Sequence, residues 1–115
     1  GHAGPLVVRA GDGHEILEAT GTVLGAFPDV SWREGRTSLG PGDVLVLLSD
    51  GVMEAARVAA SELGPDRLAA AVRATGGGSA SALLAALQSA AEESLGGARR
   101  ADDHTFVVVR RQPAQ

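Results

Sequence analysis

Three aspartates stand at the ends of the two most apolar stretches of this sequence. Asp50 follows the stretch 44–49, and Asp102 and Asp103 precede the stretch 105–109. A carboxylate at the end of a buried strand is costly to desolvate unless a cation, an arginine or a helix N-terminus compensates its charge. Several aspartate oxygens, without cysteine or a histidine cluster, suit a hard cation such as Mg²⁺ or Mn²⁺. These aspartates are therefore the first candidates for a metal site.

The aspartates converge only if the two apolar stretches are neighbouring strands. A short, unbroken, valine-rich run bounded by turn residues predicts a strand that is covered on both faces. If 44–49 and 105–109 pair antiparallel, the end of the first and the start of the second fall on the same edge of the sheet. The alternative is structural, since an Asp-Gly pair after a strand is often only a turn. Spacing alone leaves both interpretations open.

The first half of the sequence is predicted to be a β-meander with strands at 6–10, 14–18, 30–39 and 44–49. Gly11-Asp12-Gly13 between the first two strands is a typical hairpin turn. The third strand alternates only loosely and is expected to be half-exposed, with Trp32 packing in the core or at an edge. Gly40-Pro41-Gly42-Asp43 forms the turn before the central strand.

The second half is predicted to contain two helices and a last strand, at 65–75, 80–95 and 105–109. Pro65 suits the first position of a helix, the glycines 76–78 end it, and Ser79 is a suitable N-cap for the next helix. The expected buried positions are Leu68, Ala71, Val72 and Thr75 in the first helix and Leu83, Leu84, Leu87, Ala91 and Leu95 in the second. The alanine-rich stretch 52–61 is left open between a short helix and an ordered loop.

Composition narrows the class of protein. The 115 residues are enough for one domain at most, and a net charge of −4 provides no basic field for nucleic acid or an anionic membrane. The absence of cysteine excludes disulfides and thiolate metal sites. No run approaches the ~18 apolar residues of a membrane span, and no signal peptide opens the sequence. We therefore expect a soluble, cytoplasmic protein with an aliphatic core.

Six short motifs occur in register along the chain: Gly1-His2-Ala3-Gly4-Pro5-Leu6, Leu24-Gly25, Leu39-Gly40-Pro41-Gly42-Asp43, Ser49-Asp50-Gly51-Val52-Met53-Glu54-Ala55, Leu63-Gly64-Pro65-Asp66-Arg67-Leu68 and Ala101-Asp102-Asp103-His104-Thr105. Together they resemble the C-terminal part of a metal-dependent Ser/Thr phosphatase domain of the SpoIIE-like branch of the PPM (protein phosphatase 2C) superfamily. There the pattern reads GHPPP, LG, LxPGDxLxLYTDGVxEA, FGxxRL and DDxT. The resemblance extends from Gly1 to about Arg110.

This resemblance implies an α+β fold of two antiparallel sheets packed face to face, with helices outside and a two-metal Mn²⁺ or Mg²⁺ centre at one edge. Asp50 matches the metal-binding Asp of the TDG motif, and Asp102 matches the first Asp of DDxT, so both are expected to be catalytic metal ligands. Asp103 is a third candidate ligand. In such domains the metals activate a bridging water that attacks phosphoserine or phosphothreonine. The expected substrate is a phosphorylated regulatory protein of the anti-anti-sigma (STAS) type in bacterial sigma factor signalling.

The sequence also departs from the family pattern. The N-terminal half of the domain is missing, so residues 1–111 are expected to be its C-terminal part, with a polar tail at 112–115. In the family that N-terminal half supplies further metal ligands, so the isolated chain is expected to be a poor phosphatase. The exposed sheet edges then favour a homodimer. The stretch 56–61, alanine-rich here, replaces a family segment of Asn, Pro, Asp and Gly, which affects substrate docking.

Other residues admit two interpretations. His2 could touch substrate or metal, but a histidine in a glycine-rich turn is more often structural. His104 could support the metal ligands, although a surface position at the start of a strand is the simpler expectation. Arg99 and Arg100 could attract phosphate but more often such a pair is solvated. For the whole chain the alternatives to an enzyme are a non-catalytic regulatory or partner-binding module and a plain structural fragment, which the residues upstream of Gly1 would discriminate.

Overall fold

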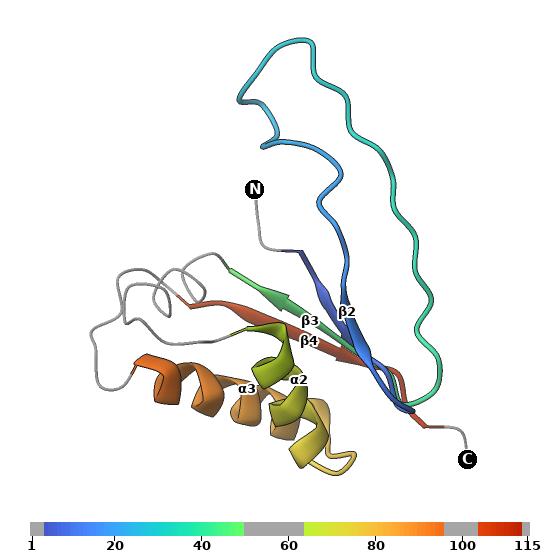
Figure 1. The fold of residues 1–115 in the computed structure, drawn as a ribbon, viewed down its shortest axis with the longest axis vertical. Helices are drawn as coiled ribbons and strands as arrows, with labels where there is room; N and C mark the ends of the chain where they lie inside the picture. Colours follow the sequence, from blue (N-terminus) through green and yellow to red (C-terminus); the bar gives the residue numbers. More distant parts are fainter. Residues whose placement is uncertain (1–3, 50–63, 96–103, 114–115) are drawn as a thin grey trace.

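The computed structural model describes residues 4–49, 64–95 and 104–113. These residues form, in order, β1 (Leu6–Val8), β2 (His14–Ile16), β3 (Val44–Leu48), α2 (Pro65–Ala74), α3 (Ala80–Leu95) and β4 (Phe106–Arg110). Both helices lie on one side of the sheet, and the segment between β2 and β3 extends away from them (Figure 1). The expected α+β fold class is confirmed.

The four strands form one antiparallel sheet in the order β2-β1-β3-β4. β1 and β2 are joined by the predicted hairpin, closed by a hydrogen bond of 3.1 Å from the Arg9 N–H to the Gly13 carbonyl. β3 pairs with β1 on one side and with β4 on the other, and Leu48 lies opposite Phe106. The condition under which the two candidate ends share one edge, antiparallel pairing of the two apolar strands, is therefore met.

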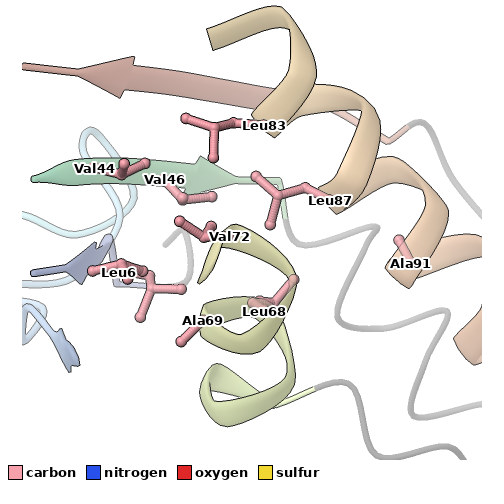
Figure 2. Packing of buried hydrophobic residues seen from close by; sticks show 10 residues of the cluster. Leu6, Val44, Val46, Leu68, Ala69, Val72, Leu83, Leu87 and Ala91 are labelled. Atoms are coloured by element: carbon pink, nitrogen blue, oxygen red, sulfur yellow. The ribbon is translucent and has the colours of Figure 1, made fainter. Parts of the chain in front are cut away.

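The core lies between the sheet and the two helices. Its members are aliphatic and come from β1, β3 and both helices (Figure 2): Leu6, Val8, Val44, Val46, Leu68, Ala69, Val72, Leu83, Leu87 and Ala91. Fully burying a valine or leucine side chain contributes roughly 1.5–3 kcal/mol. Phe106 packs against this cluster at its margin. The expectation of an aliphatic core is borne out.

The expectation that β3 and the last strand are covered on both faces is wrong for the described residues. Along both strands burial alternates, and the side chains that face away from the helices are exposed: Leu47 by 37%, Val107 by 46% and Val109 by 44%. Unbroken apolar runs indicate two covered faces. In the described part of the chain, helices α2 and α3 cover only one face.

The strand expected at 30–39 is also absent, because residues 17–43 contain no strand. Trp32 is 42% exposed rather than packed in the core, and Phe27 is 60% exposed. The indole N–H of Trp32 donates to the Thr22 carbonyl at 2.7 Å, so the ring folds back on its own segment. A Cβ at Gly21 would lie 2.1 Å from the Trp32 ring, which requires glycine there. Loose alternation does not make a strand where no neighbouring strand pairs with it.

The helices begin and end as their sequence predicts. Pro65 is in the first turn of α2, and the helix closes at Thr75 before Gly76, whose φ is +62°. The Ser79 hydroxyl accepts a hydrogen bond of 3.2 Å from the Ala82 N–H, which is the predicted N-cap of α3.

The buried stripe of α2 differs slightly from the prediction. Leu68 and Val72 are buried as expected, but Ala69 is buried and Ala71 is only half-buried. The stretch 52–61 lies outside the described residues, so neither of its alternatives is tested.

Candidate functional site

The edge of the sheet where β3 ends and β4 begins is the place at which the candidate carboxylates were expected. Beyond the Leu48–Phe106 pair the ladder continues for one more residue on each strand. The Ser49 N–H donates to the Thr105 carbonyl at 2.9 Å, and the Thr105 N–H donates to the Ser49 Oγ at 2.9 Å. We refer to this pair as the Ser49–Thr105 edge. It joins two segments that are distant in the sequence.

The predicted ligands Asp50, Asp102 and Asp103 themselves lie outside the described residues, as do His2, Arg99 and Arg100. In the sequence, Asp50 directly follows Ser49, and Asp103 stands two positions before Thr105. Residues 4–49, 64–95 and 104–113 alone contain no group of three or more acidic or histidine side chains that could hold a metal.

His104, which directly follows these aspartates, is half-buried rather than a surface side chain. Its Nε2 is buried and has no hydrogen-bond partner among the described residues. Buried polar atoms nearly always have a partner, so an orphaned nitrogen marks a place where a polar group or ion is expected. The oxygen donors that the sequence provides next to it suit a hard cation. The side-chain types that the sequence provides here are therefore those that suit a divalent metal, although the aspartates themselves lie outside the described residues.

A hollow of about 510 Å³ borders the Ser49–Thr105 edge. Among the described residues of its wall, Ser49 and Thr105 alone have polar side chains, and the others are apolar or glycine: Gly4, Pro5, Ala19, Leu47, Leu48 and Val107. This hollow offers apolar contact next to Ser49 and Thr105.

The other end of β3 carries an aspartate with a different role. Asp43 is 7% exposed. Its Oδ1 accepts from the Ala10 N–H at 2.8 Å, and its Oδ2 accepts from the Gly40 N–H at 2.8 Å and from Arg9 Nη1 at 3.0 Å. The backbone hydrogen bonds from Ala10 and Gly40, together with the Arg9 guanidinium, hold the pKa of the Asp43 carboxyl below its usual value.

Arg9 extends this arrangement to neighbouring segments. Besides Asp43 it pairs with Glu15 of β2, and it donates to the Ser38 carbonyl at 2.6 Å and to the Thr37 hydroxyl at 3.3 Å. The hydrogen bonds to Asp43 and Glu15 raise the pKa of Arg9 above its usual value. We call this group the Arg9–Asp43 clamp. It ties β1, β2 and the segment before β3 together.

The sequence pattern predicts only a turn at Asp43 and indicates no role for Arg9. A signal existed, because a Pro-Gly-Asp turn that leads into an apolar strand leaves backbone N–H groups for the aspartate to accept. The distant arginine that completes the clamp is brought in by pairing of β1 with β3, which no local pattern contains.

Comparison with known protein families identifies the chain's relatives at the level of a family. A sequence model of the family described as Stage II sporulation protein E (SpoIIE) matches residues 1–112, a range that includes all three candidate aspartates. No curated protein and no solved structure matches the chain significantly. No helix in the described part of the chain is long and apolar enough to cross a membrane.

Proposed function

Because the chain belongs to the SpoIIE (Stage II sporulation protein E) family of PPM-type phosphatase domains, we propose that it takes part in metal-dependent hydrolysis of phosphoserine or phosphothreonine in a regulatory protein. The observation that carries this proposal is the antiparallel register of β3 and β4. That register holds Ser49 against Thr105, and the candidate carboxylates flank these two residues in the sequence.

Asp50 and Asp102 are the proposed ligands of Mn²⁺ or Mg²⁺, with Asp103 as a further ligand. When bound, such metals supply positive charge that activates water and stabilises the phosphoryl oxygens. The chain's own contribution is to bring acidic side chains from two distant segments to one sheet edge. The two hydrogen bonds between Ser49 and Thr105 fix that edge. No covalent protein nucleophile is required.

The ligand set of this chain is incomplete for two metals. Mg²⁺ takes about six oxygen ligands, and a pair of ions needs several carboxylates to hold it rigidly. We therefore propose that residues 1–111 are the C-terminal part of a phosphatase domain and that further ligands come from other residues. The isolated chain should then turn over substrate poorly, if at all.

The proposed substrate is a phosphorylated regulatory protein of the anti-anti-sigma (STAS) type, in the cytoplasm. The net charge of −4 argues against an anionic nucleic acid as the partner. A homodimer is proposed on separate grounds. β4 is the last strand of the described sheet, with neighbouring exposed side chains of Val107 and Val109. Open strand edges of this kind favour pairing with another chain.

The deciding experiment is Mn²⁺-dependent phosphate release from a phosphoserine peptide, measured on this chain and on a protein extended upstream of Gly1. Asp50→Asn and Asp102→Asn are the test variants. Asp29→Asn is the matched control, since Asp29 is exposed and its φ of +57° is one that asparagine also adopts.

We expect the extended protein to release phosphate and the two test variants to lose that activity, while Asp29→Asn keeps it. Isothermal titration with Mn²⁺ should show weaker binding in the same two variants. A folded extended protein without activity would contradict the proposal and point to a non-catalytic regulatory module.

A further inference from the structure

A second cavity, of about 400 Å³, opens at the end of the sheet that lies opposite the Ser49–Thr105 edge. Its wall includes the start of β3, the end of β4 and the last turn of α2. Among the described residues that line it, three are arginines, Arg9, Arg73 and Arg110, and none is acidic. The cavity is therefore distinct from the proposed metal edge in both place and charge.

The three arginines are not equivalent. Arg9 is engaged with Asp43 and Glu15 in the clamp, so its charge is compensated. Arg73 donates to the Gly13 carbonyl at 2.6 Å, and Arg110 donates to the Gly78 carbonyl at 2.5 Å. A carbonyl fixes a guanidinium without neutralising it. Neither Arg73 nor Arg110 forms an ion pair with a carboxylate in residues 4–49, 64–95 or 104–113.

Each of these two guanidinium groups has five N–H donors and donates to the carbonyl through one nitrogen. The remaining N–H groups can bind a ligand. The C-terminal end of α2 adds a partial negative charge at this place, about half an elementary charge. Two full positive charges outweigh it. A Cβ at Gly77 would lie 3.4 Å from Arg110 Nη2, so the guanidinium lies close against the loop that follows α2.

The rest of the wall is largely apolar. Val44 of β3, Val72 of α2 and Leu83 of α3 line it from the core side, and these three side chains lie near one another where the sheet meets the helices (Figure 2). Pro41 and Pro113 contribute further apolar surface. A ligand that fits must therefore present an anionic group to the arginines and an apolar body to this wall.

We propose that this cavity binds a small organic anion, with a phosphate or carboxylate group held by Arg73 and Arg110 and an apolar body against Val44, Val72 and Leu83. Planar guanidinium groups recognise both oxyanions through paired hydrogen bonds. The proposal does not depend on the phosphatase assignment, because it uses no residue of the metal edge.

The test is isothermal titration of the chain with phenylphosphonate, whose carbon–phosphorus bond is not hydrolysed by a phosphatase, in the presence of EDTA to remove divalent metals. Inorganic phosphate and benzoate are titrated in parallel. The test variant is Arg73→Gln, with Arg73→Lys to retain the charge. Arg67→Gln is the matched control, because Arg67 lies on the same helix, pairs with Glu93 and does not line the cavity.

We expect saturable one-to-one binding of phenylphosphonate and benzoate, with weaker binding of inorganic phosphate. Arg73→Gln should weaken binding roughly tenfold, because the anion loses one of its two charged hydrogen-bond donors. Arg73→Lys should recover part of the loss, and Arg67→Gln should bind as the original chain does. Thermal unfolding of each variant verifies that it is folded.

Three results would overturn the proposal. One is the absence of saturable binding by the folded chain. Another is equal weakening by Arg67→Gln and Arg73→Gln, which would indicate general charge attraction. The third is inorganic phosphate binding as tightly as phenylphosphonate, which would remove the role of the apolar wall. None of these results bears on metal-dependent phosphate release, so the two proposals fail separately.

Discussion

The two ends of β3 use the same kind of residue for different purposes. At the start of the strand, Asp43 is buried and accepts hydrogen bonds from Ala10, Gly40 and Arg9. At the far end, the described contacts are the two hydrogen bonds between Ser49 and Thr105, and the next residue in the sequence is Asp50. At the start of the strand, donors of the protein itself bind the carboxylate. At the far end, we propose that a metal binds.

The partners of an aspartate distinguish a structural residue from a candidate metal ligand. Both Asp43 and Asp50 border the same apolar run and stand next to a glycine. Asp43 has its charge compensated by an arginine and two backbone N–H groups of the fold itself. A carboxylate so satisfied has little capacity left for a metal, and its expected contribution is to stability.

The largest effect should separate the two ends by activity. In the extended protein, Asp50→Asn should lower Mn²⁺-dependent phosphate release by roughly a hundredfold or more, because metal stabilisation of the transition state is worth several kcal/mol. Asp43→Asn should leave the activity per folded molecule unchanged. Steady-state kinetics on both variants, corrected for the folded fraction by circular dichroism, tests this. Equal losses in kcat would erase the distinction.

The next largest effect is on thermal stability, where substitution of Asp43 should matter more than substitution at the far end of β3. Asp43→Ala removes the acceptor of three hydrogen bonds and leaves Arg9 without its buried partner. We expect Tm to fall by several degrees in a chain of this size. Glu18→Ala, at an exposed position, is the control. Thermal unfolding by circular dichroism measures both; an unchanged Tm in Asp43→Ala would show that the clamp contributes nothing.

The Arg9–Asp43 clamp should also make the stability of the chain depend on pH. The pKa of Asp43 is lowered from its ordinary value of 3.8. The unfolded state therefore binds a proton first as the pH falls, and the contribution of Asp43 is fully present above pH 3.8 and lost progressively below it. Urea unfolding across this range should show a steeper loss in the original chain than in Asp43→Asn. Parallel pH profiles for the two proteins would argue against it.

The smallest effect is expected at the opposite end of the strand. Ser49→Ala removes the Oγ that accepts from the Thr105 N–H, a partly exposed contact worth about 0.5–1 kcal/mol. Ser81→Ala, at an exposed helical position, is the control. Urea unfolding measures the stability, and Mn²⁺ titration of the extended protein measures metal affinity. A stability loss as large as that of Asp43→Ala would mean that the two ends are equally clamped.

Much of the fold follows from local sequence patterns. The helix ends at Pro65, Gly76 and Ser79 rest on backbone chemistry that acts within a few residues, and each is where the sequence predicts it. The hairpin around Gly11–Gly13 is equally local. The pairing of β3 with β4 is not local, and the sequence supported it only as a condition, because two apolar runs can pair in either direction or not at all.

The predictions that were wrong concern residues whose structure depends on distant partners, which local sequence patterns do not specify. The loose alternation at 30–39 predicts a strand, but a strand exists only where another strand accepts its hydrogen bonds. Trp32 was expected in the core or at an edge, and it is 42% exposed and donates a hydrogen bond to the Thr22 carbonyl of its own segment. For the site, the resemblance named Asp50, Asp102 and Asp103, which lie outside the described residues and stay predictions. His104, next to these aspartates in the sequence, was expected at the surface. The structure shows instead that it is half-buried and that its Nε2 has no hydrogen-bond partner among the described residues.

The register of β3 and β4 has a consequence for the synthesis of the protein. Leu48 pairs with Phe106, and residues 49–105 must be made between them. At about 5–20 residues per second, a ribosome needs several seconds for that stretch. During this time one side of the most apolar strand has no hydrogen-bonding neighbour, although β1 can already occupy the other side. β4 is thus the last strand of the described sheet to be made, and a chaperone that binds extended apolar segments has its longest opportunity at the open side of β3.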